Sequence, residues 1–166
     1  AEGAVRILDL TINNDPYGKF SSLVTLDKDN QKKLNFSGSI ENLQQSVLFS
    51  GDYDLNKKYL SSNYEIEKLP LSFFEYLIPD GISGTSGYVS GDLHIGGPLG
   101  DINVDGNAIA YEGKTKINYL GTSYFVDKQK IKIKKDLIDF TGLELKDELG
   151  NKGYVKGGIR HRLFND

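Results

Sequence analysis

The segment from Gly81 to Asp105 constrains the fold of this chain more than any other. Its sequence, GISGTSGYVSGDLHIGGPLGDINVD, alternates apolar with polar residues and is interrupted repeatedly by glycine. Glycine supplies positive φ in tight turns, and inside a strand it leaves room for a close neighbour. The pattern therefore predicts short strands joined by hairpins and argues against a catalytic loop. The alternating apolar residues are Val89, Leu93 and Ile95, then Ile102 and Val104, and directly after the segment Ala108 and Ala110.

The same alternation extends over most of the remaining chain, with Ser, Asn, Asp, Thr, Glu and Lys at the positions between the apolar ones. KIKIKK at 130–135 is its most regular instance. NNDPYG, DKDNQK and DLNKK separate the early runs and have the composition of turns. We expect about a dozen strands of roughly five to nine residues, antiparallel to their neighbours, each with one apolar and one wet face.

The segment 70–79 breaks this alternation. Its residues LSFFEYLI are aromatic and aliphatic without a two-residue period, and they lie between Pro70 and Pro79. Proline is tolerated at the first turn of a helix and ends one elsewhere. We predict one short helix here, with Leu71, Phe74 and Leu77 facing an apolar surface that the helix covers.

Composition excludes several classes of function. The 166 residues have a net charge of −3 and no cysteine, so a basic nucleic-acid surface, a disulfide framework and a thiolate metal site are not expected. The two histidines, His94 and His161, are far apart in the sequence and lie on polar positions of strands. No G-x-S-x-G elbow or phosphate-binding loop with its lysine is found. We therefore expect no enzymatic activity, no metal and no cofactor.

Alternation alone leaves the architecture open. A closed barrel and an open, curved, elongated sheet could both use these strands, and a sandwich with a dry core would show the same pattern. The pattern alone favours the sandwich.

The second half of the chain resembles the TamB family, the AsmA-like proteins of diderm bacteria, in their Bacteroidetes-type form. ISGTSGYVSGDLHIGGPLG resembles the family's V-S-G-x-L-x-I-x-G-x-L entry, and DINVDGNAIAYEGKTKINYLGTSY resembles its next hairpin. IDFTGLELKDELGNKGYVKGGIRHRLFND resembles its closing motif. The resemblance covers residues 80–166, whereas 1–79 match only in style. Gly100-Asp101 replaces the Asn-Pro that often precedes the family's second strand.

The resemblance implies an all-β fold: an elongated, curved antiparallel sheet that forms an open hydrophobic groove, called a β-taco. Residues 1–166 would then be a fragment of a longer groove, with first strands in 1–79 and TamB-like strands in 80–166. The implied function is to conduct phospholipid between inner and outer membranes, in the periplasm, within a parent protein anchored in the inner membrane. The implied partners are phospholipid acyl chains and an outer-membrane barrel protein of the BamA/TamA-like type.

The residues expected to line this groove share one parity within each strand. They are Leu93, Ile95, Ile102, Val104, Ala108, Ala110, Ile117, Tyr119, Ile131, Ile133, Val24, Phe36 and Phe49. An open groove would tolerate a charge such as Val104→Asp or Ile117→Arg without unfolding. Two alternatives remain: a chaperone or assembly module that takes up strands of outer-membrane barrels by augmentation, and a structural all-β sandwich.

Overall fold

The computed structural model describes residues 1–12, 15–29, 31–76 and 80–160. These residues form thirteen strands and one short 3-10 helix, η1 (Leu71–Tyr76). The strands are β1 (Glu2–Ile12), β2 (Asp15–Leu26), β3 (Lys33–Glu41), β4 (Ser46–Asp54), β5 (Tyr59–Pro70), β6 (Ile82–Pro98), β7 (Asn103–Ile117), β8 (Thr122–Val126), β9 (Gln129–Lys134), β10 (Leu137–Asp139), β11 (Glu144–Asp147), β12 (Lys152–Tyr154) and β13 (Gly158–Arg160).

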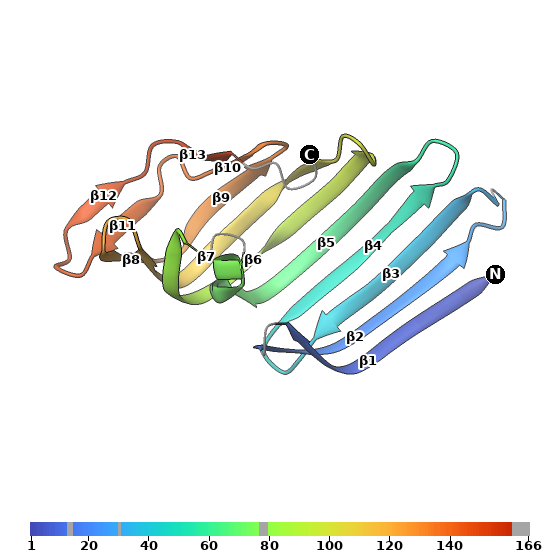
Figure 1. Cartoon of the computed structure of the whole chain (residues 1–166), viewed down its shortest axis with the longest axis horizontal. Coiled ribbons are helices and arrows are strands. Elements are labelled where there is room, and N and C mark those ends of the chain that lie inside the picture. The colour runs from blue at the N-terminus through green and yellow to red at the C-terminus, as the bar shows by residue number, and fades with distance from the viewer. Residues whose placement is uncertain (13–14, 30, 77–79, 161–166) are drawn as a thin grey trace.

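All thirteen strands belong to one antiparallel sheet, which confirms the predicted all-β fold. β1 to β8 follow one another in sequence order, and β11 and β12 continue beyond β8 (Figure 1). Within the described residues β1 pairs only with β2, so the sheet does not close into a barrel. No second sheet packs on the first in this part of the chain, so the architecture is not a sandwich.

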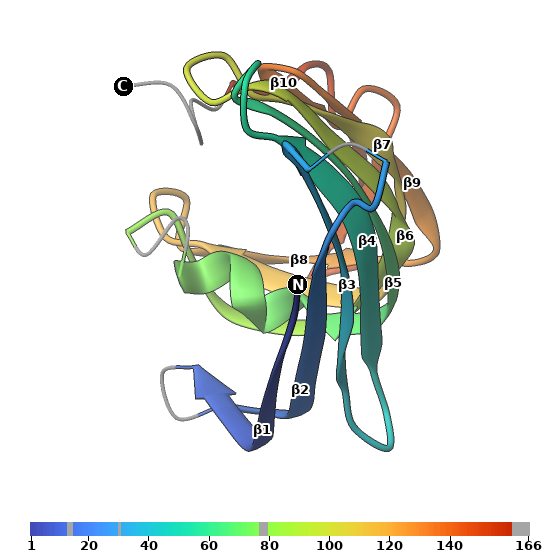
Figure 2. The ribbon, with the colours of Figure 1, turned by 90° about the vertical axis from the view of Figure 1, so that its right-hand side faces the viewer.

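Strand β7 divides the sheet into two branches. Its residues 106–110 pair with β9, whereas its residues 113–117 pair with β8. Glu112 lies between these two ladders with a positive φ of 50°. The β9 branch continues through β10 to β13, and the β8 branch through β11 to β12. Seen from the side, the two branches are part of one C-shaped ribbon that is open on one side (Figure 2).

Irregularities in the ladders coincide with the bends of this ribbon. The register shifts in β1–β2 beside Gly18, in β5–β6 beside Lys68, and in β6–β7 beside Gly87. These residues have positive φ values of 95°, 54° and 98°. Bulges increase local twist and bend a strand. Glu112 in β7 is a fourth residue with positive φ at such an irregularity. The curvature of the ribbon therefore arises from local backbone conformations in several strands.

The glycine-rich segment differs from its prediction in strand length. Instead of several short runs, Ile82–Pro98 forms one strand of 17 residues, and Asn103–Ile117 forms one of 15. Gly91 and Gly106 lie inside these strands, and the turn between them occupies 99–102. At Gly91 and Gly106 the backbone of the neighbouring strand comes close, so these glycines mark a close approach of two strands and not a turn.

Helix η1 confirms the short helix expected in 70–79, although it is a 3-10 helix; the predicted contact of Leu77 falls outside the described residues. It lies on the inner side of the curved ribbon (Figure 2). Leu71 reaches Gly113 of β7, where an added Cβ would lie 3.3 Å from Leu71 Cδ1. Phe73 packs edge-on against Tyr17, with 6.3 Å between ring centroids. The helix thus covers part of the sheet at its bend.

A hydrogen bond holds the outer end of η1 to β2. The hydroxyl of Tyr76 donates to Asp15 Oδ2 at 2.6 Å. This bond to a carboxylate raises the pKa of Tyr76 to about 12. Burial raises the pKa of the Tyr17 phenol beside it.

Candidate functional site

The register of the ladders assigns every central side chain to one of two faces. Phe20, Ile40, Val47 and Ile66 oppose one another across β2 to β5 and therefore share a face. The same register continues through Gly91 and Ala108 to Ile131. We call this the apolar face. Ten of the residues predicted to line a groove lie on it: Leu93, Ile95, Val104, Ala108, Ala110, Ile131, Ile133, Val24, Phe36 and Phe49.

Three other predicted lining residues lie outside this central ladder. Ile102 precedes β7 and is buried. Ile117 lies beyond the bulge at Glu112, where it pairs with Ile82 and Thr122. Tyr119 lies in the turn between β7 and β8 and is 94% exposed, so it is not on the sheet face. Its position in the alternating pattern does not assign it to a face, because alternate residues share a face only inside a strand.

The apolar face lies on the inner side of the curve. Although the sheet has a single layer, Val89, Val104, Ala108 and Ala110 are buried on this face. Helix η1 lies on the inner side of the same curve (Figure 2). Near β1 the face is open: Val5 is 57% exposed and Ile7 and Val24 are close to 40%. The face is thus an open hydrophobic groove, buried along β6 and β7 and accessible toward β1.

Aromatic rings form the middle of this groove. Phe49 stacks with Phe20 at 6.2 Å and with Tyr64 at 6.1 Å between centroids. Phe49 lies over Gly38 of the neighbouring strand, where an added Cβ would collide with its ring. Because the Phe49 ring covers the backbone of Gly38 and stacks with its two neighbours, the three rings form a broad apolar surface. The parity of Phe20 and Tyr64 was visible in the sequence, but their contact depends on the pairing of β2 to β5.

Three more glycines on the apolar face lie against backbone. A Cβ added to Gly51 would lie 2.7 Å from Ser62 Cα, and one added to Gly91 would lie 2.7 Å from Ala108 Cα. One added to Gly106 would lie 3.0 Å from Leu93 Cα. Real Cβ atoms essentially never come within 3.0 Å of such atoms. These positions require glycine because the adjacent strand occupies the space.

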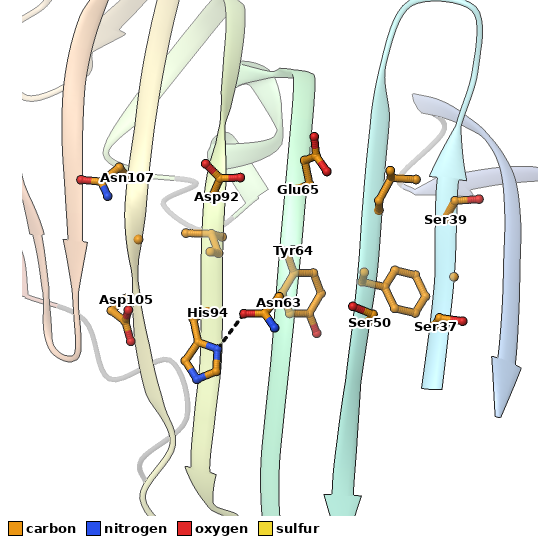
Figure 3. Close-up of a pocket in the computed structure, with 15 residues that line it drawn as sticks. Ser37, Ser39, Ser50, Asn63, Tyr64, Glu65, Asp92, His94, Asp105 and Asn107 are labelled. Carbon is orange, nitrogen blue, oxygen red and sulfur yellow. Dashed lines mark hydrogen bonds between the residues drawn. The ribbon is translucent and has the colours of Figure 1, made fainter. Parts of the chain in front are cut away.

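The opposite face is polar and carries a shallow hollow of about 810 Å³ across β3 to β7 (Figure 3). Its side chains come from two rows of cross-strand neighbours: Ser37, Ser50, Asn63, His94 and Asp105 in one row, Ser39, Leu48, Glu65, Asp92 and Asn107 in the other. His94 Nδ1 and Asn63 Oδ1 are 3.0 Å apart and hydrogen-bonded. Lys130 and Lys132 also lie on this face, opposite to the predicted groove residues.

The described side chains offer no catalytic or metal-binding arrangement that we recognise. Among the described residues, no three His, Cys, Asp or Glu side chains are placed to hold a metal ion. His94 is bonded to an amide rather than to a nucleophile. Ser62, the most deeply buried serine, donates to the carbonyl of Ile95 at 3.1 Å. In the same residues we find no helix with the length and apolar character needed to cross a membrane.

Comparison with known proteins identifies no relative of this chain. No family model, no curated protein and no solved structure matches it. The resemblance to TamB proteins therefore remains a prediction from the sequence, and the geometry of the groove is the main observation on which a function can be argued.

Proposed function

We propose that this chain is a segment of a hydrophobic groove that holds phospholipid acyl chains and lets them pass along it, in the manner implied by the resemblance to TamB proteins. The observation that carries the proposal is the open apolar face. A dry core would cover Val5, Ile7 and Val24, which are all more than a third exposed. In keeping with the resemblance, the proposal sets the segment in the periplasm, between the two membranes, with a barrel protein of the BamA/TamA-like type as a partner.

The energetics of acyl chains suit such a face. Each methylene transferred from water to an apolar surface contributes about 0.8 kcal/mol. The rings of Phe20, Phe49 and Tyr64 offer a continuous surface without a deep pocket, since the neighbouring Gly38 adds no side chain. A surface of this kind favours acyl chains at many equivalent positions. Movement from one position to the next then needs little net free energy.

A matched pair of variants on one strand tests the proposal. Leu23 and Val24 are consecutive in β2, both 39% exposed, and point to the polar and the apolar face respectively. Aspartate at either position should change the free energy of unfolding to a similar, modest extent. Only Val24→Asp places a hydrated carboxylate in the groove. If two or three methylenes lose their burial, lipid binding weakens by roughly 2 kcal/mol, or about thirtyfold.

The assay is extraction of a fluorescent phosphatidylethanolamine from phosphatidylglycerol vesicles, followed by native mass spectrometry of the protein. We expect lipid on the unmodified chain and on Leu23→Asp, and much less on Val24→Asp, with unchanged circular dichroism for all three. Equal lipid on both variants would remove the apolar face as the binding surface. Absence of lipid from the unmodified chain, together with capture of extended barrel-strand peptides, would favour the assembly-module alternative.

A further inference from the structure

The two branches of the sheet meet along one line, and this line carries an inference that does not depend on lipid binding. β8 and β9 both pair antiparallel with β7, so they run in the same direction, one after the other. β10 and β11 follow one another along β9 and β8 in the same way, and so do β12 and β13 along β11 and β10. Each of these pairs is therefore one long strand, interrupted at 127–128, 140–143 or 155–157. We call the line of interruptions the crease.

The crease continues through β5, β6 and β7. The register shifts at Lys68 between β5 and β6 and at Gly87 between β6 and β7, and β7 changes its partner at Glu112. All three residues have positive φ. Two of the later interruptions contain Gly142 and Gly157, with φ values of 87° and 110°. Uncommon backbone conformations cluster at switch regions, and hinges consist of a few residues that absorb changes in φ and ψ. Here such residues lie in line across adjacent strands.

The part of the sheet beyond the crease is an arm that includes helix η1. The arm consists of residues 82–86 of β6, residues 113–117 of β7, and strands β8, β11 and β12. Two contacts fix η1 to it: the carboxylate of Glu75 accepts a hydrogen bond from the N–H of Thr85 in β6, and Leu71 lies against Gly113 of β7. Any movement of the arm would therefore carry η1 with it.

Strands β1 and β2 bend at a bulge of their own, beside Gly18. The described residues beyond it, 10–12 and 15–17, form a hook that turns away from the rest of the two strands (Figure 2). Strand β3 ends at Glu41, opposite Lys19, so it does not extend along the hook. In the part of the chain that the structure describes, no strand ladder joins the hook to the arm.

Side chains of η1 make the connection between the arm and the hook. The hydroxyl of Tyr76 donates to Asp15 Oδ2 at 2.6 Å. The ring of Phe73 packs edge-on against Tyr17, which is 4% exposed. We call these two contacts the latch. The latch consists of one hydrogen bond and one ring contact, whereas the strands within the arm are held together by ladders.

We propose that the arm turns about the crease as one unit and that the latch holds it against the hook. Opening then breaks the two contacts of the latch and leaves the ladders on both sides of the crease intact. The arm and η1 lie on the inner side of the curve, so their position sets how wide the groove is (Figure 2). An open arm would widen the groove for acyl chains, although the hinge itself does not rest on that function.

Paired spin labels test the movement, and the chain contains no cysteine that would interfere with labelling. One pair spans the latch, with Thr11→Cys in the hook and Tyr119→Cys in the β7–β8 turn of the arm; both positions are exposed. A second pair lies on the other side of the crease, with Leu55→Cys and Leu99→Cys in the turns after β4 and β6. Double electron–electron resonance, recorded without lipid, should give one main distance for each pair while the latch is intact.

The latch is then removed in two steps. Tyr76→Phe deletes only the hydrogen bond and should raise the population of longer distances across the latch about fivefold. Adding Phe73→Ala removes the ring contact and should make the longer distances dominant. Tyr154→Phe is the matched control, because its hydroxyl donates to Glu144 Oε2 at 3.2 Å within the arm. We expect unchanged distances across the latch in this control, and an unchanged second pair and circular dichroism in every variant.

Two results would overturn the proposal. A distance across the latch that stays the same in the double variant, with strand content retained, would show that the crease is rigid. Equal broadening for both label pairs would show general loosening of the sheet and no hinge. If the double variant loses strand content, Tyr76→Phe alone decides, and distances identical to those of Tyr154→Phe would refute the latch. Because no lipid is present, a failure of the proposed lipid binding leaves this result unaffected.

Discussion

Gly91→Ala should destabilise the sheet even though it adds a single methyl group. Gly91 lies on the apolar face of β6, between Ile66 of β5 and Ala108 of β7. The added Cβ would lie 2.7 Å from Ala108 Cα, 3.0 Å from the carbonyl carbon of Asn107, and closer still to the carbonyl oxygen of Asn107. All three atoms belong to backbone, so no side-chain rotation relieves the contact. β6 and β7 must separate, which also weakens their hydrogen bonds.

The loss of stability follows from two destabilising terms and one that offsets them. Overpacking of a filled site costs about 1–3 kcal/mol, and a weakened backbone hydrogen bond adds about 1 kcal/mol. Replacing glycine restricts the unfolded chain and offsets about 0.4–1 kcal/mol of this. The net loss is about 1–3 kcal/mol. For a chain of this length, that lowers Tm by roughly 3–10 °C.

Gly3→Ala is the matched control. Gly3 lies on the same face, in β1, and a Cβ added there meets no atom within 4 Å. This variant should match the unmodified chain or exceed its stability by about 0.5 kcal/mol, because only the unfolded chain is affected. Thermal melts and urea midpoints of the two variants provide the measurement. If Gly91→Ala proves as stable as Gly3→Ala, the close approach of β6 and β7 is not what requires glycine.

Two further outcomes follow from burial and from the bond at η1. Val104→Asp should lower the free energy of unfolding by about 3–5 kcal/mol relative to Val24→Asp, measured by urea denaturation, because Val104 is 6% exposed and Val24 is 39% exposed. Tyr76 should be the last phenol to ionise in an ultraviolet titration, because its pKa in the folded chain is about 12, above the ordinary 10.0. The stability contributed by its hydrogen bond to Asp15 is therefore complete below pH 10 and is lost as the pH rises through 12. Tyr76→Phe should remove that late step, and persistence of the step would refute the bond to Asp15.

The strand pattern and the identity of the two faces could be read from the sequence. Alternation placed Leu93, Ile95 and Val104 on one face, and the ladders give the same result. Strand length could not be read in this way. Glycine marks a turn in one place and a close approach of two strands in another: Gly100 lies in the turn after β6, whereas Gly91 lies inside that strand, against the backbone of β7. Only the position of the neighbouring strand distinguishes the two.

Curvature was hidden for a different reason. Lys68 and Glu112 adopt positive φ at bulges, although neither residue type favours that conformation. Nothing in their local sequence indicates a bulge. The conformation of Lys68 accompanies the register shift between β5 and β6, and that of Glu112 accompanies the pairing of β7 with β6 on one side and with β8 and β9 on the other. Whether the sheet closes or stays open depends on such bends, so alternation could not separate a barrel from a groove.

The depth of burial along the groove is likewise a property of the assembled sheet. Val24 and Val104 are the same residue type on the same face, and in sequence pattern they are equivalent. Val104 lies at the start of β7, opposite Ile95, and is buried, whereas Val24 lies in β2, beside β1, and is accessible. An acyl chain gains most where apolar surface is still in contact with water. For the proposed lipid binding, the part that a ligand can cover is therefore the β1–β5 half of the groove, with its stacked Phe20, Phe49 and Tyr64. The tolerance of a charged substitution that the sequence predicts is expected in that half and not at Val104.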